Sequence, residues 1–405
     1  MTVKPFHALR PKPLYAEAVA ALPYDVMNTE EARIIAANNP HSFLHVDKAE
    51  IDLPPDTDPY SPAVYAKAKE NLQSLVDTGV FMQDEQPRLY IYQLEANDRI
   101  QTGLAACVSV AEYEKGLIKR HEFTRPDKEQ DRIDHILACS AHTGPIFMAY
   151  RDSSGLTAPK ALMAKWMRDH SPDYDFTAED GVRHTLWVID DAAAIQELMQ
   201  AFEAVSYFYI ADGHHRNEAA RKAALINSAA ESQFYLAVVF PHDELTIMDY
   251  NRVVTDLNGQ DVSAFLLALK AVCTVKESPI PVKPDHKHVV GMYLNGQWYR
   301  LSLPNDKNAD PLDNLDVAVL QNKILSPILG INDPKTDKRI DFVGGIRGLA
   351  ELEKRVDSGE MAVAFSMYPT SMDELMAVAD ANQIMPPKST WFEPKLRSGL
   401  LVHGF

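Results

Sequence analysis

Five consecutive residues bring a carboxylate, a glycine, two imidazoles and a guanidinium together: Asp212-Gly213-His214-His215-Arg216. They follow the aromatic and β-branched run 207–210, which predicts a buried strand. Residues 216–224 have high helix propensity. A strand that turns through glycine into a helix leaves backbone N–H groups unpaired beside the positive end of the helix dipole, where an anion binds well. The segment therefore predicts a phosphate-binding turn, although Asp-Gly alone can also form an ordinary turn and helix cap.

Carboxylates occur with Arg, Lys and His near several predicted turns, and this set of side chains suits phosphoryl transfer, in which positioning and charge neutralisation do most of the catalysis. The predicted phosphate-binding residues are Gly213, His214, His215 and Arg216. Asp212 and His215 are candidate catalytic groups. For the carboxylate that deprotonates an attacking hydroxyl we favour Glu122 and then Asp25, because both lie in irregular segments dense in polar residues.

Other carboxylates could bind Mg²⁺ through their oxygens, but the sequence does not indicate which ones. The same residues would also serve metal-assisted hydrolysis of a phosphate ester, with water as the nucleophile. Four polar residues are spaced so that they fall on one face of a predicted helix: Asp127, Asp131, Asp134 and His135. This face could be functional, or it could be an ordinary solvated surface.

A basic, proline-rich tail at residues 385–399 contrasts with the acidic chain. Its prolines preclude a regular helix. Lys388, Ser389 and Lys395 could close over a nucleotide, or could anchor the tail through salt bridges. Both interpretations remain open from the sequence.

Well-known nucleotide signatures are missing. The sequence has no Gly-x-x-x-x-Gly-Lys-Ser/Thr loop and no convincing Gly-x-Gly-x-x-Gly after a strand. The glycine-rich run 343–348 could approach a ligand but is a weak signal alone. No Gly-x-Ser-x-Gly or His-Glu-x-x-His motif is found.

The bulk composition is that of an ordinary globular protein, with 46% hydrophobic and 24% charged residues. A net charge of −17 argues against non-specific binding to nucleic acid. No stretch is long and apolar enough to cross a bilayer, and the first residues lack the apolar core of a signal peptide, so we expect no membrane partner and a cytoplasmic location. The three widely spaced cysteines predict neither a disulfide framework nor a structural zinc site.

Strand and helix patterns alternate along the chain and predict an α/β fold (α+β possible), with a mixed sheet core and flanking helices. Asn28 and Glu31 predict a capping box, and Ser61-Pro62 predicts the start of an amphipathic helix. Asn295-Gly296 predicts a hairpin turn. We expect a main domain at residues 1–256 and a C-terminal α/β unit with the basic tail at 257–405.

Four motifs in order resemble a known family over nearly the whole chain: Pro23-Tyr24-Asp25-Val26, His121-Glu122-Phe123-Thr124, Ala211-Asp212-Gly213-His214-His215-Arg216 and Pro386-Pro387-Lys388-Ser389-Thr390. This is the family of domain of unknown function 1015. The third motif is also similar to the phosphate-binding element of the ParB/sulfiredoxin-like superfamily, which includes free serine kinases.

The second resemblance implies a ParB/sulfiredoxin-like element and a kinase that transfers phosphate from ATP (or ADP), with Mg²⁺, to the hydroxyl of free serine or a similar metabolite. Its partners would be a nucleotide and a small-molecule substrate. Two alternatives stay open: a metal-dependent phosphohydrolase, and a nucleotide-binding regulator without catalytic activity. Neither the sequence nor the resemblance indicates an oligomeric state.

Overall fold

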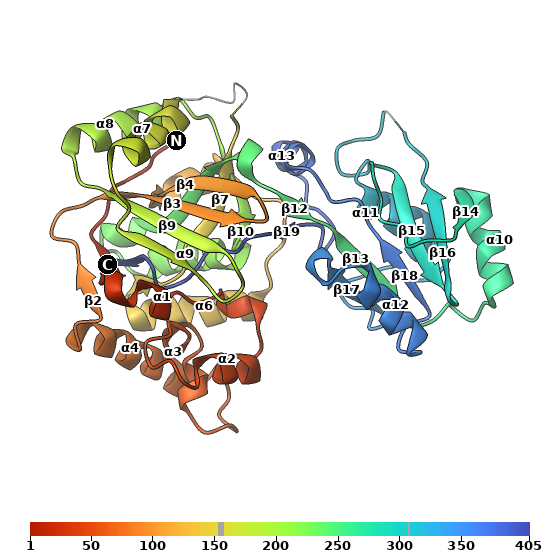
Figure 1. Ribbon diagram of the computed structural model, residues 1–405, viewed down its shortest axis with the longest axis horizontal. Helices are drawn as coiled ribbons and strands as arrows, with labels where there is room; N and C mark the ends of the chain where they lie inside the picture. Colours follow the sequence, from red (N-terminus) through yellow and green to blue (C-terminus); the bar gives the residue numbers. More distant parts are fainter. Residues whose placement is uncertain (153–157, 307) are drawn as a thin grey trace. The chain divides into compact units, whose positions relative to one another are not determined.

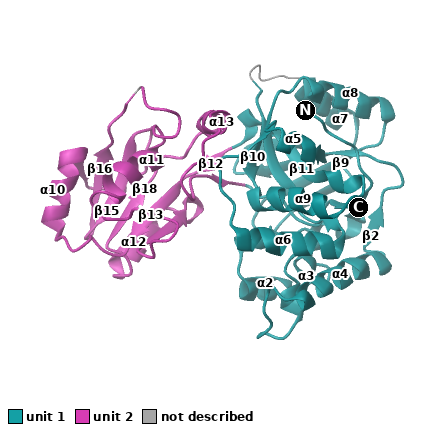
Figure 2. Cartoon of the chain, turned by 180° about the vertical axis from the view of Figure 1, so that it is seen from behind, with its two compact units in different colours: residues 1–245, 394–405 teal, residues 246–393 magenta. Residues whose placement is uncertain are grey.

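The computed structural model describes residues 1–152, 158–306 and 308–405 (Figure 1). It contains two compact units, Met1–Leu245 with Pro394–Phe405, and Thr246–Glu393 (Figure 2). The sequence placed the division at residues 256 and 257. In the structure it falls after Leu245, and the last twelve residues belong to the first unit. Local composition carries no signal for this return, because it depends on strand pairing between distant parts of the chain.

The first unit is built on a mixed eight-stranded sheet of the described residues, ordered β5-β10-β7-β11-β4-β3-β9-β8. The β5–β10 and β7–β11 pairs are parallel and the other neighbours are antiparallel. The predicted α/β fold with a mixed sheet is thus confirmed. The strands are β3 (Leu89–Ala96), β4 (Arg99–Ser109), β5 (Ile118–Lys119), β7 (Ile146–Tyr150), β8 (Tyr174–Thr177), β9 (Arg183–Ile189), β10 (Phe208–Asp212) and β11 (Phe234–Pro241).

Apolar side chains of these strands pack against helices α7 (Ala158–Asp169) and α8 (Ala192–Glu203), which lie side by side (Figure 1). Met163 of α7 and Phe202 of α8 are buried there, as are Ala220 and Ala224 of α9 (His214–Ile226). Helices α5 (Val110–Glu114) and α6 (Pro126–Cys139) complete this part. The buried face of α9 is therefore made of small alanine side chains.

A second sheet in the first unit has the order β2-β1-β20-β6, with β2 (Phe81–Gln83), β1 (Ala8–Pro11), β20 (Val402–Gly404) and β6 (Ala141–His142). The C-terminal strand β20 pairs with both β1 and β6. Beside this sheet lie α1 (Ala16–Val19), α2 (Thr29–Ala36), α3 (Leu44–Asp47) and α4 (Pro62–Asp77). The predicted capping box of Asn28 and Glu31 opens α2, and Ser61 is the residue before α4.

The second unit has an antiparallel six-stranded sheet in the order β14-β16-β15-β18-β13-β17. Its elements are β12 (Ile247–Met248), β13 (Tyr250–Val254), α10 (Val262–Val272), β14 (Thr274–Ser278), β15 (Val289–Leu294), β16 (Gln297–Ser302), α11 (Asp316–Leu320), β17 (Ile340–Gly344), α12 (Leu349–Asp357), β18 (Val363–Ser366), α13 (Met372–Asp380) and β19 (Trp391–Phe392). The predicted Asn295-Gly296 hairpin joins β15 and β16. None of the described helices has the length and apolar character needed to cross a bilayer.

Candidate functional site

The predicted turn joins β10 to α9 through Gly213, whose φ of +92° lies in the left-handed region that glycine tolerates best. The helix begins at His214, two residues before the start that propensity predicted. Both histidines are therefore in the first turn of α9, where backbone N–H groups lack partners within the helix. A Cβ built on Gly213 would lie 3.1 Å from three guanidinium atoms of Arg216, so the turn is closed on one side by that side chain.

We predict that Gly213→Ala destabilises the protein by more than the cost of its positive φ, which is roughly 1–2 kcal/mol for an L-residue. The extra cost comes from displacing the Arg216 guanidinium. Gly116→Ala is the matched control in the same unit, because Gly116 also has a positive φ (+72°) but a Cβ there meets no atom within 4 Å. Urea unfolding of both variants measures the difference, and equal losses would show that Arg216 does not constrain the turn.

Two helices begin at the same place in the first unit. The backbone N–H of Arg125, immediately before α6, donates to Nε2 of His215 in the first turn of α9, at 3.0 Å. Further along, Ile133 and Ile136 of α6 pack against Ala219 and Ala223 of α9, so the helices run parallel. The positive ends of both dipoles therefore converge, which strengthens the attraction for an anion such as a phosphate group.

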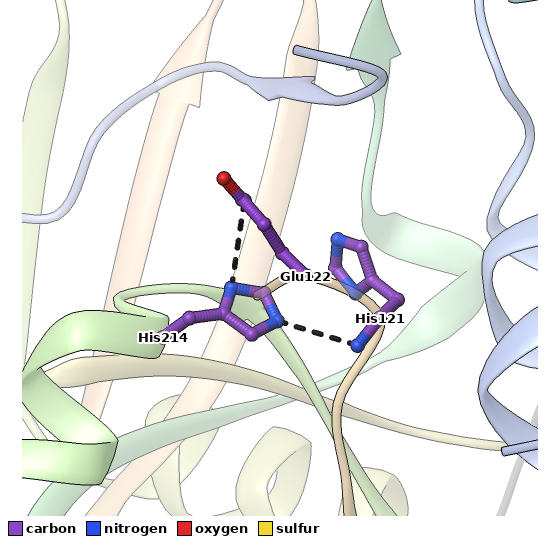
Figure 3. Close-up of side chains that lie close together, drawn as sticks. All are labelled: His121, Glu122 and His214. Carbon is purple, nitrogen blue, oxygen red and sulfur yellow. Dashed lines mark hydrogen bonds and ion pairs between the residues drawn. The ribbon is translucent and has the colours of Figure 1, made fainter. Parts of the chain in front are cut away.

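Glu122 lies directly beside this turn. Its Oε2 is 3.8 Å from Nδ1 of His214, and the Nε2 atom of the same ring accepts the backbone N–H of His121 at 3.5 Å (Figure 3). A neutral ring whose Nε2 accepts a hydrogen bond carries its proton on Nδ1. That N–H faces the Glu122 carboxylate. The side chain of Glu122 is 41% exposed, whereas that of His214 is buried, so an accessible carboxylate lies beside a buried N–H group, at a distance longer than a hydrogen bond.

The imidazoles of His121, His214 and His215 are neutral at pH 7. Burial lowers the pKa of His121 to about 4, although the charge of Asp212 acts in the opposite direction. Burial also lowers the pKa of His214 and of His215, and the nearby charges of Asp25 and Glu129 oppose it at His215. The site therefore holds neutral rings that donate or accept single hydrogen bonds.

His121, Glu122 and His214 have nitrogen and oxygen atoms within 4.8 Å of one another, and two imidazoles with a carboxylate are a donor set that suits zinc. The hydrogen bonding of His214 does not fit this use. Its Nε2 lone pair already accepts the His121 N–H, and its Nδ1 proton, rather than a lone pair, points toward Glu122. The arrangement fits an oriented acid–base pair better than a transition-metal site.

We predict that the free energy of unfolding falls at acidic pH, because several buried histidines are neutral in the folded protein. The pKa of His121 and of His403 is lowered to about 4 and that of His184 to about 3, chiefly by burial in each case. The unfolded chain has its histidine pKa near 6.5, so it binds more protons than the folded chain between about pH 6.5 and 4. This stabilisation is complete above pH 6.5 and is lost as the pH falls toward 4. His45 acts oppositely, because its hydrogen bond to Asp52 raises its pKa.

We expect each of the three histidines to contribute a loss on the order of 2 kcal/mol between pH 7.5 and pH 5. Urea unfolding at pH 7.5, 6 and 5 measures it, in a window above the range where most carboxylates titrate. Unfolding free energies that are equal at pH 7.5 and pH 5 would contradict the prediction.

Asp212, at the end of β10, is bound from the C-terminal tail. The Nζ atom of Lys395 lies 3.0 Å from Oδ2 of Asp212, and Oδ1 accepts the backbone N–H of Gly213. Burial raises the pKa of Asp212, but the charges of Lys395 and Arg216 outweigh it and keep the carboxyl ionised. Of the two sequence interpretations for Lys395, the salt bridge is present, and it lies at the turn itself.

The other candidate site residues, Asp25, Lys388 and Ser389, are spread over the two units. Asp25 is exposed in the first unit, close enough for its charge to act on His215. Lys388 and Ser389 belong to the second unit, where the Lys388 carbonyl accepts from Arg252 and the Ser389 hydroxyl donates to the Pro386 carbonyl. A role for them in nucleotide binding stays a prediction.

Sequence reasoning missed a group of polar residues that surround Arg216. Tyr24, Asp47, Arg132, His142 and Thr143 line one pocket with it. Tyr24 belongs to a quoted motif, and Arg132 follows the polar face of α6. The sequence around Asp47 and around His142 contains no motif that would mark either residue as functional. The Thr143-Gly144-Pro145 turn, which joins β6 to β7, is the local sequence feature at this place that could have signalled it.

Comparison with known proteins gives one family and several distant structures. A family model described as "Protein of unknown function (DUF1015)" matches residues 3–318. A conserved hypothetical protein from Pyrococcus furiosus is 13% identical, with a TM-score of 0.35 over 73% of this chain and 94% of the other. A free serine kinase in complex with AMP is 12% identical, with a TM-score of 0.37 over 73% and 92% of the two chains.

SbnI from Staphylococcus aureus, truncated at its C-terminus, is 11% identical, with a TM-score of 0.37 over 73% of this chain and 85% of the other. No curated protein matches the sequence. The residues around the α9 turn, rather than these distant similarities, carry the functional inference.

Proposed function

The chain belongs to the DUF1015 family, and we propose that it is a phosphotransferase that moves a phosphate from a nucleotide, ATP or ADP, to the hydroxyl of free serine or a similar metabolite. The observation that carries the proposal is the position of Glu122 beside His214, at a point where two helices begin. A carboxylate fixed next to an anion-binding helix end is the pairing that phosphoryl transfer to an alcohol requires.

In this proposal the backbone N–H groups at the start of α9 and the side chain of His215 bind the phosphates of the nucleotide, and Lys395 compensates the charge of Asp212 beside them. Gly213 lets the backbone approach them. Glu122 takes the proton from the acceptor hydroxyl while the alcohol oxygen forms a bond to phosphorus and the bond to the leaving nucleotide breaks. His214 is a positioning residue, since its Nδ1–H faces the carboxylate. Asp25, near His215, is the next candidate for the base.

Mg²⁺ would enter with the nucleotide. Mg²⁺ in such sites takes most of its ligands from phosphate oxygens and water, with one or two carboxylates. Asp212 is already compensated by Lys395 and by the Gly213 N–H, so it is a poor ligand for the ion. The ion would neutralise charge on the transferred phosphate.

The experiment is a product assay with pure protein, Mg²⁺, ATP or ADP, and a panel of hydroxylated amino acids that includes serine. We expect a phosphorylated amino acid in a one-to-one ratio with the nucleotide consumed, measured by phosphorus NMR. Release of inorganic phosphate without an acceptor product would support a phosphohydrolase instead. Tight nucleotide binding without any turnover over hours would support a non-catalytic regulator.

A further inference from the structure

Residues 394–398 bring the C-terminal tail into the first unit, directly after the second unit ends at Glu393. Lys395 of this segment pairs with Asp212 at the α9 turn. A lysine on a flexible segment loses backbone and side-chain entropy when it is held in one place. The ion pair is therefore favoured only if other contacts already fix the backbone beside Lys395.

Arg397, two residues after Lys395, is held through both its backbone and its side chain. It is 6% exposed. Its backbone N–H donates to the hydroxyl oxygen of Tyr92 at 3.4 Å, and its Nε donates to Nε2 of His184 at 3.2 Å. A neutral imidazole that accepts at Nε2 carries its proton on Nδ1, and this atom lies 2.8 Å from the same Tyr92 oxygen. The three residues therefore close a ring of hydrogen bonds.

Further contacts attach the same point of the tail to the first unit. Nη2 of Arg397 donates to Asp180, so the buried guanidinium has a compensating charge. The next residue, Ser398, exchanges two backbone hydrogen bonds with Ala21, at 2.8 and 3.2 Å. Tyr92 and His184 belong to the paired strands β3 and β9 of the eight-stranded sheet. Arg397 is thus fixed to the core of the unit.

The short separation along the chain makes this anchor effective at Lys395. Two residues of extended chain span at most about 7 Å, so the attachment of Arg397 limits where the Lys395 backbone can lie. The lysine then meets Asp212 at little further cost in entropy. A functional side chain is held precisely when a supporting set of contacts fixes the residues around it.

A buried arginine network can also serve only to stabilise a fold. Arg10 is such a case in the same unit: it is 4% exposed and donates to Asp84 and to the Tyr174 hydroxyl. Neither of these partners belongs to residues 394–398. Because Arg10 matches Arg397 in burial and in the kinds of groups it binds, it is the control for a purely structural role.

We propose that Arg397 is a positioning residue that holds Lys395 on Asp212 and thereby keeps the charge at the α9 turn compensated. Its effect on the nucleotide rests on the proposed function, whereas its effect on the position of Lys395 does not. Loss of the anchor releases the lysine. The Asp212 carboxylate then repels the phosphates at the neighbouring N–H groups.

Acetylation of lysine side chains on the full chain, measured by mass spectrometry, tests the position of Lys395 without any nucleotide. Lys395 is 11% exposed and ion-paired, so its amine should react slowly in the wild-type protein. In Arg397→Met its rate should rise at least about fivefold, the scale on which one hydrogen bond shifts an equilibrium. Lys4, paired with Glu231, should keep its rate in that variant, and Lys395 should keep its rate in Arg10→Met. An unchanged rate at Lys395 in Arg397→Met, or an equal rise in Arg10→Met, would overturn the proposal.

Asp180→Asn covers the case in which Arg397→Met does not fold. The side chain of Asp180 is 42% exposed, and asparagine keeps an oxygen for the backbone N–H of Val182. The variant loses the charge that holds the Arg397 guanidinium, so Lys395 should be acetylated at least about twofold faster. If Arg397→Met cannot be purified, an unchanged rate at Lys395 in Asp180→Asn overturns the proposal.

Calorimetric titration with ATP or ADP and Mg²⁺ separates this inference from the proposed function. Arg397→Met should weaken nucleotide binding at least about fivefold. In the Asp212→Asn/Lys395→Met background, which has no lysine to position, the same substitution should change the affinity by less than about threefold. An equal loss in both backgrounds would show that Arg397 acts only through the stability of the fold, and would overturn the proposal. Faster acetylation of Lys395 in Arg397→Met, with no nucleotide bound by the wild type, would refute the proposed function and keep the positioning role.

Discussion

Glu122→Gln is expected to lower the turnover of the proposed phosphotransfer by on the order of 10²–10⁴-fold, the range that a positioned general base contributes. The substitution keeps the size of the side chain and an oxygen atom on the side of the His214 Nδ1–H, but glutamine cannot take a proton from the acceptor hydroxyl. Nucleotide affinity should change by less than about threefold, because in our proposal the phosphates are bound by backbone N–H groups and His215. The loss of activity should therefore appear in kcat, while the Kd for the nucleotide should stay nearly unchanged.

The measurement is steady-state kinetics with the acceptor identified by the product assay, together with calorimetric titration of the nucleotide. Glu114→Gln is the matched control: its side chain is 46% exposed and lies 3.6 Å from Arg221, close to the geometry of Glu122 beside His214. The Glu114→Gln variant should therefore turn over at the wild-type rate. If Glu122→Gln also keeps wild-type turnover, Glu122 is not the base, and Asp25→Asn becomes the variant to measure.

The conformation of the turn was predictable from the sequence because it is local. Glycine at the end of an apolar strand, followed by helix-forming residues, specifies the left-handed residue and the helix start within a few positions. The capping box at Asn28 and the hairpin at Asn295-Gly296 were predicted for the same reason. Each of these signals needs only neighbouring residues.

The partners of the turn were not predictable, because they come from distant parts of the chain. Lys395 reaches Asp212 only because the tail returns to the first unit as β20. Asp47 meets the Gly144 turn through the packing of α3 near β6, which no periodicity reveals. Helix propensity also placed the start of α9 too late, since histidine is a weak helix former and tertiary packing overrides that preference.

Lys395→Met is expected to weaken nucleotide binding by roughly 10–100-fold, the scale of a hydrogen bond between charged groups. Lys395 compensates the Asp212 carboxylate at the turn that we propose binds the phosphates. Without it, a negative charge stays beside the place where the phosphates bind, and that charge repels them. Because Arg216 also lowers the pKa of Asp212, the carboxyl should remain ionised in the variant.

The double variant Asp212→Asn/Lys395→Met separates two roles for the lysine. If the lysine acts by compensating Asp212, removing both charges should restore affinity to within about threefold of wild type, and this is the result we expect. A double variant as weak as the single one would instead indicate direct contact between Lys395 and a phosphate. Lys4→Met is the control, since it breaks a comparable ion pair with Glu231, 2.7 Å long, elsewhere on the unit. Wild-type nucleotide affinity in Lys395→Met would remove Lys395 from the site, and weakened binding in Lys4→Met would mean that the effect is not specific to the turn.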